Sequence, residues 1–336
     1  MLNDNLKKSI CFVGIGLLLA FSLNSLLIYG LRHYQGGAGF DVWNQIIDGK
    51  AGADILISGS SRALIDFDCQ AISQVTKMSC YNIGFDGQRY NLIRPLLETY
   101  LKHNRKPKIV VLTVGITDLS VDDIFRPYQF IPYLNENELY KVVVKKMPEF
   151  RYDKYVPLYA FTIYKKDLLT RALKGLRSTD TKSCVRSCVR TNQETEWADV
   201  PRINGFLPVD RQWSNEFEAF KSKFPKGKEY KIAPSLVDDL EAIIQRFQQE
   251  NIKVLLVFPP VYYESIEGYT KNLNEIFQTY KAIAERNHIQ LMDYSKDPMS
   301  KDTKYFYNSQ HMNKKGAAYF SSIFAESIIL LKPGNN

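Results

Sequence analysis

"ADILISGSSRALIDF", residues 53–67, is the stretch of sequence that decides the predicted fold. The apolar residues 55–57 predict a buried strand, Gly59 predicts a tight turn, and the apolar spacing after Ser61 predicts a helix. A strand that passes through a turn directly into a helix is typical of α/β proteins with a parallel sheet. The turn also puts Ser60 and Ser61 at the carboxyl end of the strand, which is where such sheets bind their ligands.

The same alternation of strand and helix continues on both sides of a less regular middle region. The near-continuous apolar run "PKIVVLTVG" (107–115) is typical of a strand buried on both faces. The pattern predicts a three-layer, flavodoxin-like parallel sheet, with a largely helical, aromatic-rich insertion that is either ordinary core or the wall of a sugar-binding groove. Further strands are predicted within 79–87, 252–260 and 289–295, and helices at 63–76, 91–103, around 240–247, at 272–286 and after Asn313.

The N-terminus predicts a membrane anchor. Ser9–Leu31 is 23 residues long and carries no charge, and as a helix it would reach about 35 Å, enough to cross a bilayer core. Lys7 and Lys8 precede it and Arg32 and His33 follow, so the flanking charges nearly balance and leave the orientation open. The predicted organisation is a signal anchor at 1–33, a juxtamembrane linker at 34–52, and an α/β domain at 53–334 with its insertion at about 119–231.

Composition limits the partners of the chain. A formal net charge of +8 in 336 residues favours anionic partners, although ordinary lysine-rich faces would give the same balance. No phosphate-binding loop, zinc-ligand spacing or nucleic-acid motif is present, so no cofactor, metal or nucleic acid is predicted. Among five cysteines, Cys184 and Cys188 are expected to be free thiols or a local disulfide.

Two side chains far apart in the sequence suit nucleophilic catalysis. A hydroxyl nucleophile needs a base to take its proton and hydrogen-bond donors for the oxyanion. Ser61 supplies a hydroxyl, His311 a base just before the last helix, and the backbone N–H groups of Ser61 and Gly87 are candidate donors. The plainer alternatives are that Ser61 caps its helix, His311 lies on the surface and Gly87 only allows a turn.

Four segments together resemble the SGNH/GDSL hydrolase superfamily. They are "ILISGSSRAL" (55–64), "YNIGFDG" (81–87), "VVLTVGITD" (110–118) and "NSQHMNKKGAAYF" (308–320), in the order and spacing of that family's first, second, third and fifth blocks. The resemblance implies that Ser61 is the nucleophile, His311 the base, and that Gly87, or else Gly84, donates to the oxyanion. It further implies a membrane-anchored serine esterase or O-acyltransferase outside the cytoplasm, acting on an acylated envelope glycan or a related anionic polymer.

Two positions depart from the family pattern. Thr117 stands where the family has its oxyanion asparagine, and loss of one oxyanion donor typically costs about 10²–10³ in rate. Asn308 stands where an aspartate orients the histidine, and an amide carries no charge to stabilise the imidazolium. Three other carboxylates are candidates for that place: Asp86, Asp118 and Asp293. The alternative function is therefore a catalytically weakened relative that acts as a scaffold or binding protein, with protein partners, in envelope polysaccharide assembly.

Overall fold

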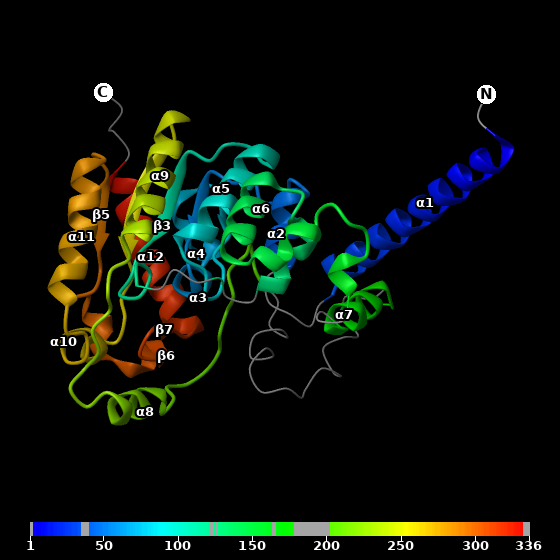
Figure 1. The fold of residues 1–336 in the computed structure, drawn as a ribbon. Helices are drawn as coiled ribbons and strands as arrows, with labels where there is room; N and C mark the ends of the chain where they lie inside the picture. The colour runs from blue at the N-terminus through cyan, green and yellow to red at the C-terminus, as the bar shows by residue number, and fades with distance from the viewer. Residues whose placement is uncertain are drawn as a thin grey trace. The chain divides into compact units, whose positions relative to one another are not determined.

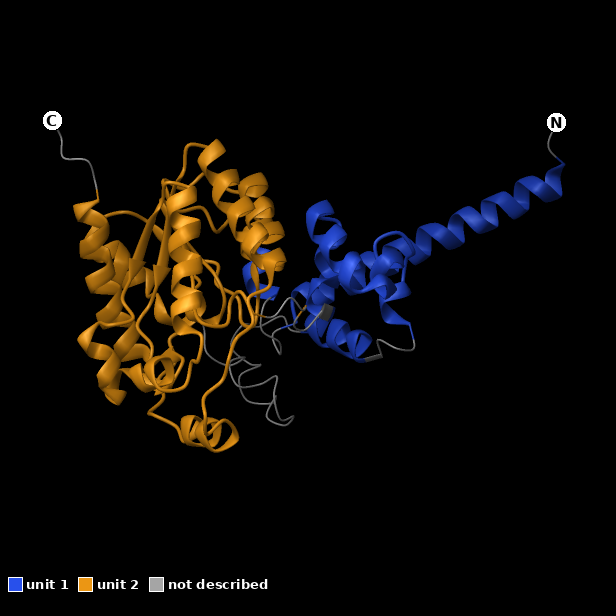
Figure 2. Cartoon of the chain, turned by 60° about the vertical axis from the view of Figure 1, so that its left-hand side comes forward, with its two compact units in different colours: residues 1–44, 126–199 blue, residues 45–125, 200–336 orange. Residues whose placement is uncertain are grey.

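The computed structural model describes residues 3–34, 40–120, 124, 127–162, 166–177 and 202–331 (Figure 1). The chain folds into two compact units (Figure 2). Unit 1 is Met1–Asn44 with Arg126–Asp199, and unit 2 is Gln45–Phe125 with Val200–Asn336. The region predicted as one insertion is thus shared between the units. Cys184 and Cys188 lie outside the described residues.

Unit 2 contains a five-stranded sheet in which every neighbouring pair of strands is parallel. The strand order is β2-β1-β3-β4-β5, which is the flavodoxin-like order, so the predicted fold is confirmed. In this order β2 is added on one side of β1 and β3 on the other, so the direction of winding changes between β1 and β3. The carboxyl ends of these two strands lie side by side at the same end of the sheet. The strands are β1 (Ile55–Ser58), β2 (Cys80–Asn82), β3 (Ile109–Thr113), β4 (Lys253–Phe258) and β5 (Gln290–Asp293).

Both faces of the sheet are covered, as the apolar runs predict. Alternate residues of a strand point to opposite faces, and in β1 both sets are buried. Ile55 and Ile57 pack in a core with Phe67 and Phe320, while Leu56 points to the face that α5 and α9 cover (Figure 1). The helices of this unit are α3 (Ser61–Asp66), α4 (Cys69–Thr76), α5 (Tyr90–His103), α8 (Glu216–Lys223), α9 (Pro234–Gln249), α10 (Tyr263–Glu267), α11 (Leu273–Arg286) and α12 (Lys314–Leu330).

The single helix expected over 63–76 is two helices. Helix α3 ends at Asp66, and the Asp68 side chain accepts hydrogen bonds from the backbone N–H groups of Gln70 and Ala71, which starts α4 as a separate helix. A disulfide joins Cys69 at the start of α4 to Cys80 at the start of β2. This pairing was not predicted from the sequence.

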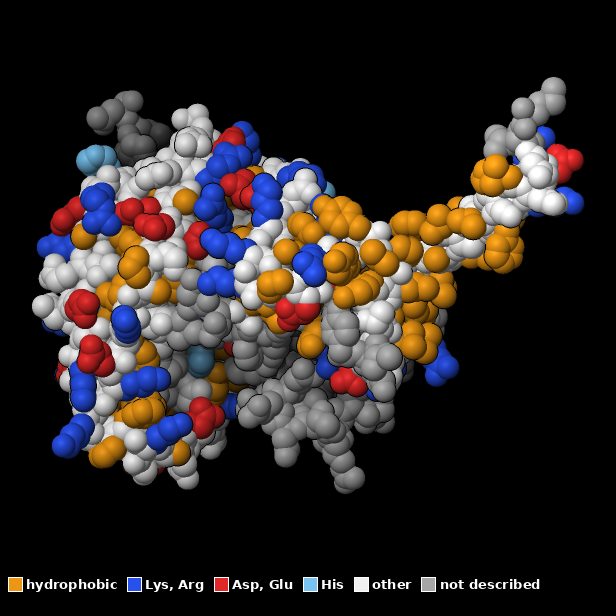
Figure 3. Space-filling model, viewed as in Figure 1, with side chains coloured by type: hydrophobic (Ala, Val, Ile, Leu, Met, Phe, Trp, Pro, Cys, Tyr) orange, Lys and Arg blue, Asp and Glu red, His pale blue; other side chains and the backbone are white. Residues whose placement is uncertain are grey.

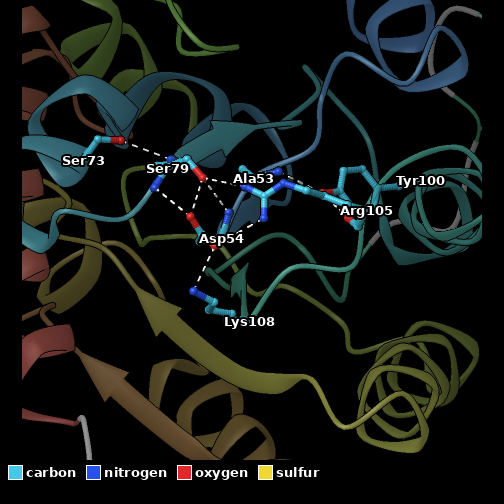
Figure 4. A network of polar contacts seen from close by, with 8 residues as sticks. Ala53, Asp54, Ser73, Ser79, Tyr100, Arg105 and Lys108 are labelled. Atoms are coloured by element: carbon cyan, nitrogen blue, oxygen red, sulfur yellow. Dashed lines mark hydrogen bonds and ion pairs between the residues drawn. The ribbon is translucent and has the colours of Figure 1, made fainter.

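A polar network closes the amino end of the sheet, opposite the serine turn (Figure 4). The Asp54 carboxylate accepts from the Ser79 hydroxyl at 2.6 Å and lies 3.2 Å from both Arg105 and Lys108. The hydrogen bond from Ser79 is the main cause that holds the pKa of Asp54 well below its usual range, and Arg105 is the next. The network therefore ties together the residues that precede β1, β2 and β3.

Unit 1 contains the apolar N-terminal helix α1 (Asp4–Arg32), whose most apolar stretch has a mean hydropathy of 2.2. Its side chains are largely exposed and apolar (Figure 3), so its length and composition suit a membrane span or a signal sequence. The C-terminal end of α1 packs on α7 (Lys166–Arg177) so closely that a Cβ at Gly30 would lie 2.3 Å from the Ala172 carbonyl oxygen. Also present are α6 (Asn137–Lys146) and the 3₁₀ segments Pro127–Tyr133, Pro148–Tyr152 and Tyr159–Phe161.

The stretch predicted as a linker, 34–52, contains helix α2 (Phe40–Ile47). Trp43 on this helix is only 1% exposed, and its ring stacks on Tyr133 with centroids 5.3 Å apart. The Tyr133 hydroxyl donates to the Phe40 carbonyl oxygen at 3.0 Å. Part of the aromatic-rich insertion therefore forms ordinary core.

Candidate active site

The turn after β1 fixes the position of Ser61. Gly59 has a φ of +154°, and a Cβ there would lie 1.9 Å from the Thr113 hydroxyl oxygen, so only glycine fits between β1 and β3. Ser60 takes the N-cap position of α3 but makes no side-chain capping bond. Ser61 is the first residue of α3, and its hydroxyl is directed to another part of the chain.

That partner is His311, which lies at the start of the short strand β7 (His311–Met312). The Ser61 Oγ is 2.8 Å from His311 Nε2, and His311 Nδ1 is 3.1 Å from Asn308 Oδ1. β7 pairs with β6 (Phe306–Asn308), so the turn between them holds Asn308 beside the ring. The Tyr307 ring lies nearly parallel to the imidazole with centroids 5.6 Å apart. The structure thus brings together three residues that the sequence separates by up to 250 positions.

The electrostatic surroundings keep the imidazole neutral. Burial is the larger cause and the Arg62 guanidinium the smaller one, and together they lower the pKa of His311 from 6.5 to about 3. A neutral ring with Nδ1–H donating to Asn308 has its Nε2 lone pair free to accept the Ser61 proton. This is the protonation state that a general base requires.

The structure distinguishes between the two glycines considered for the oxyanion. The Gly84 N–H already donates to Asn82 Oδ1 at 2.8 Å, so it is not available to an oxyanion. A Cβ at Gly84 would lie 2.3 Å from the Leu64 nitrogen, so glycine is needed here because the loop packs closely against α3. Gly87 has a φ of +70° and lines the cavity in front of Ser61. Thr117 lines the same cavity, whose volume is about 400 Å³.

Of the three alternative carboxylates, none takes the place beside His311. Asp118 is 3% exposed and lies 2.9 Å from Arg62, 3.7 Å from Arg89 and within 3.1 Å of the Ser60 hydroxyl. Asp293 lines a separate cavity of about 520 Å³, and Asp86 is not among the residues lining the cavity of Ser61. Asp118 thus compensates the buried Arg62 behind the serine turn.

One carboxylate that sequence reasoning missed does reach the site. Glu216, the first residue of α8, accepts a hydrogen bond from Asn308 Nδ2 at 2.9 Å. The segment from α8 to residue 230 also contributes aromatic and basic side chains to the cavity. No motif or periodicity marks these residues, because they precede the histidine block by some 80 to 90 positions and belong to the region predicted as an insertion. They are Phe217, Phe220, Lys228 and Tyr230.

No protein-family model and no curated protein matches the chain. Among solved structures, an acetyl xylan esterase matches at 14% identity with a TM-score of 0.40, covering 83% of this chain and 100% of its own. A Desulfitobacterium hafniense protein described as lipolytic and of the G-D-S-L family matches at 10% identity with a TM-score of 0.38, covering 81% and 98%. A carbohydrate acetylesterase from Sinorhizobium meliloti matches at 11% identity with a TM-score of 0.35, covering 82% and 98%. These similarities are distant.

Proposed function

We propose that this chain is a serine esterase or O-acyltransferase whose nucleophile is Ser61 and whose general base is His311. The observation that carries the proposal is the distance of 2.8 Å between Ser61 Oγ and His311 Nε2, in a ring whose lowered pKa keeps it neutral. His311 would accept the hydroxyl proton as Ser61 Oγ attacks an ester carbonyl carbon. The same proton would then pass to the leaving alcohol as the acyl–oxygen bond breaks.

The negative charge that develops on the ester oxygen needs donors on the opposite side of the cavity. We assign this role to the backbone N–H groups of Ser61 and Gly87 and to the Thr117 hydroxyl. All three residues line the cavity, and a turn that leads into a helix points its N–H groups outward. The acyl group would then leave Ser61 for water in an esterase, or for a sugar hydroxyl in a transferase.

The lining of the cavity supports an acylated glycan or a related anionic polymer as substrate. Among the described residues, the lining includes Arg62, Arg89 and Lys228 and one carboxylate, that of Glu216. Arg62 is buried and paired with Asp118, so it contributes its positive potential rather than a direct contact with an anionic group. Aromatic rings such as Tyr230 add flat surfaces of the kind that sugar rings contact.

We place the enzyme at a membrane, with unit 2 outside the cytoplasm. Helix α1 supports a single-pass anchor by its length and composition. The Cys69–Cys80 disulfide supports an oxidising compartment, because structural disulfides are rare in the cytoplasm. An alkaline phosphatase fused to the C-terminus tests this location: it is active only if exported, and an inactive but intact fusion would contradict it.

A fluorophosphonate probe tests the nucleophile. The probe should label the wild-type protein and not Ser61→Ala, while Ser60→Ala, one position away, should still be labelled. Release of p-nitrophenol from p-nitrophenyl acetate should disappear with the same variant. Equal labelling of wild type and Ser61→Ala would refute the assignment.

A second candidate function follows from Asn308. An amide beside the imidazole carries no charge, and the comparable aspartate-to-asparagine change in a serine protease lowers turnover by about 10⁴. On this alternative the chain is a weakened relative that holds an envelope polymer for partner proteins. A wild-type protein that binds acylated polymer but neither reacts with the probe nor releases p-nitrophenol would favour it.

A further inference from the structure

We propose that Glu216 is a positioning residue that holds the Asn308 amide in the orientation His311 needs, and that its charge partly replaces that of the missing aspartate. The inference rests on the proposed function. It assigns a role to a residue in a region that sequence reasoning treated as an insertion.

The contacts of the Asn308 amide all point to one orientation. Its Oδ1 accepts from the backbone N–H groups of Gln310 and His311, each at 3.0 Å, and faces His311 Nδ1 at 3.1 Å. Its Nδ2 donates to Glu216 Oε2 at 2.9 Å. A carboxylate can only accept hydrogen bonds. If the amide were rotated by half a turn, its oxygen would face the Glu216 carboxylate, and its NH₂ group would face the two backbone N–H donors. Glu216 therefore penalises the orientation in which Asn308 would fail to accept from the imidazole.

The carboxylate also makes the amide a better acceptor. Two backbone N–H groups and the imidazole Nδ1 converge on one Asn308 oxygen, and an amide that donates to an anion carries more negative charge on its oxygen. Proton transfer from Ser61 makes the ring an imidazolium. The hydrogen-bonded chain from His311 through Asn308 then ends on the negative charge of Glu216, where an ordinary triad would have a carboxylate in direct contact.

The fold holds Glu216 in place although its side chain is exposed to solvent. The next residue, Phe217, is 2% exposed and packs between Tyr262 and Tyr269, with ring centroids 5.7 and 5.5 Å away. This aromatic anchor fixes the first turn of α8 against α10. Exposure limits the strength of the contact, so its loss should weaken catalysis without abolishing it.

Kinetics of Glu216→Ala test the role, with Glu218→Ala as the matched control on the same helix. Removing one hydrogen bond to a charged group should lower kcat about tenfold and leave KM nearly unchanged, because the substrate does not need this contact to bind. Glu218, which pairs with Lys221 at 2.6 Å, should give wild-type kinetics when replaced. Equal kcat values for the two variants would overturn the proposal.

The variant Asn308→Asp provides a second, more specific test of the proposal. The new carboxylate would lie about as close to Glu216 as the amide does now, and two carboxylates at that distance cannot both ionise freely. At mildly alkaline pH this variant should gain little activity. The double variant Asn308→Asp/Glu216→Gln replaces the repulsion by an amide donor to the new aspartate, so it should be at least several-fold more active than Asn308→Asp alone. If Asn308→Asp alone is the more active of the two, Glu216 does not act through position 308.

A readout that needs no turnover separates this proposal from the proposed function. The chain has four histidines, so ¹⁵N-labelled histidine gives few ring signals, and that of His311 is assigned by its loss in His311→Gln. The wild-type ring should be the Nδ1–H tautomer, whereas Glu216→Ala should show a mixture. An inactive wild type with this tautomer shift would refute the esterase and retain the positioning role; identical tautomers in both proteins would refute the role itself.

Discussion

Replacing Asp118 by asparagine removes one negative charge from behind the serine turn while keeping the size and planar shape of the side chain. Asp118 and Arg62 are each 3% exposed, and the Asp118 Oδ2 lies 2.9 Å from the Arg62 Nη2. A second cation, Arg89, lies 3.7 Å from the other carboxylate oxygen. The asparagine oxygen can still accept from Arg62 and its amide can donate to the Ser60 hydroxyl, so the change isolates the charge.

The cost follows from leaving Arg62 charged and buried without its counter-ion. Removing one partner of a buried ion pair typically costs about 3–5 kcal/mol, far more than the net value of a well-formed pair. The Arg62 side chain cannot move out easily, because its guanidinium fills the space that a side chain at Gly115 would occupy: a Cβ there would lie 1.9 Å from the Arg62 Cζ. We therefore expect Asp118→Asn to destabilise unit 2 by about 3 kcal/mol or more.

Native-state hydrogen exchange measures this loss within unit 2. Amides of β1 and β3 exchange through large-scale opening, so a cost of about 3 kcal/mol should speed their exchange more than a hundredfold. Arg62→Met/Asp118→Asn removes the stranded charge and should exchange more slowly than Asp118→Asn alone. A cost below about 1 kcal/mol, or a double variant equal to the sum of the single ones, would refute the view that Asp118 compensates a buried charge.

Three further predictions concern pH, redox state and the sheet. Because desolvation and Arg62 lower the pKa of the partly buried His311 to about 3, the acid limb of kcat/KM should lie well below pH 6.5; a limb near pH 6.5 would contradict a base with a lowered pKa. Replacing Cys69 and Cys80 by serine should lower the free energy of unfolding by about 3 kcal/mol, the value expected for a closed loop with a sequence separation of 11. An unchanged thermal unfolding curve, together with no effect of a reductant on the wild-type protein, would contradict this prediction. Asp54→Asn should cost about 2 kcal/mol at neutral pH. Because the folded pKa of Asp54 is lowered, this difference should begin to shrink only near the unfolded pKa, at about pH 4, and should disappear only when the pH falls below the lowered folded pKa. Unfolding curves that differ equally at all pH values would argue against it.

The features that could be predicted from the sequence are those with local signals or with a pattern that repeats along the chain. The run from β1 through Gly59 into α3 has its strand, turn and helix signals within a dozen residues, and the parallel sheet follows from repeated alternation. Positions that depend on a hydrogen-bond partner could not be predicted in this way. Gly84 and Gly87 sit three residues apart in the same loop, and only the bond from the Gly84 N–H to Asn82 shows which one is already committed.

Two pairings escaped sequence reasoning for the same reason. The close spacing of Cys184 and Cys188 favours a local disulfide there, whereas Cys80 meets Cys69 because α4 packs against β2. Glu216 is 92 positions from Asn308, and α8 carries no periodic apolar pattern that would place its first residue at the site. Such contacts become predictable only when the strand order and the loops at its edge are known.

The Asn308 position shows why a residue that departs from a sequence motif has to be judged together with its contacts in the fold. In sequence, asparagine for aspartate removes the charge that would stabilise an imidazolium. In the structure, the amide of Asn308 joins the ring of His311 to the carboxylate of Glu216, so a negative charge lies one hydrogen bond further from the ring, on helix α8. The expected consequence is coupling: position 308 tolerates aspartate only when position 216 is neutral. On this proposal, the activity of a chain with this substitution depends on a residue outside the motif, which is identified from the fold.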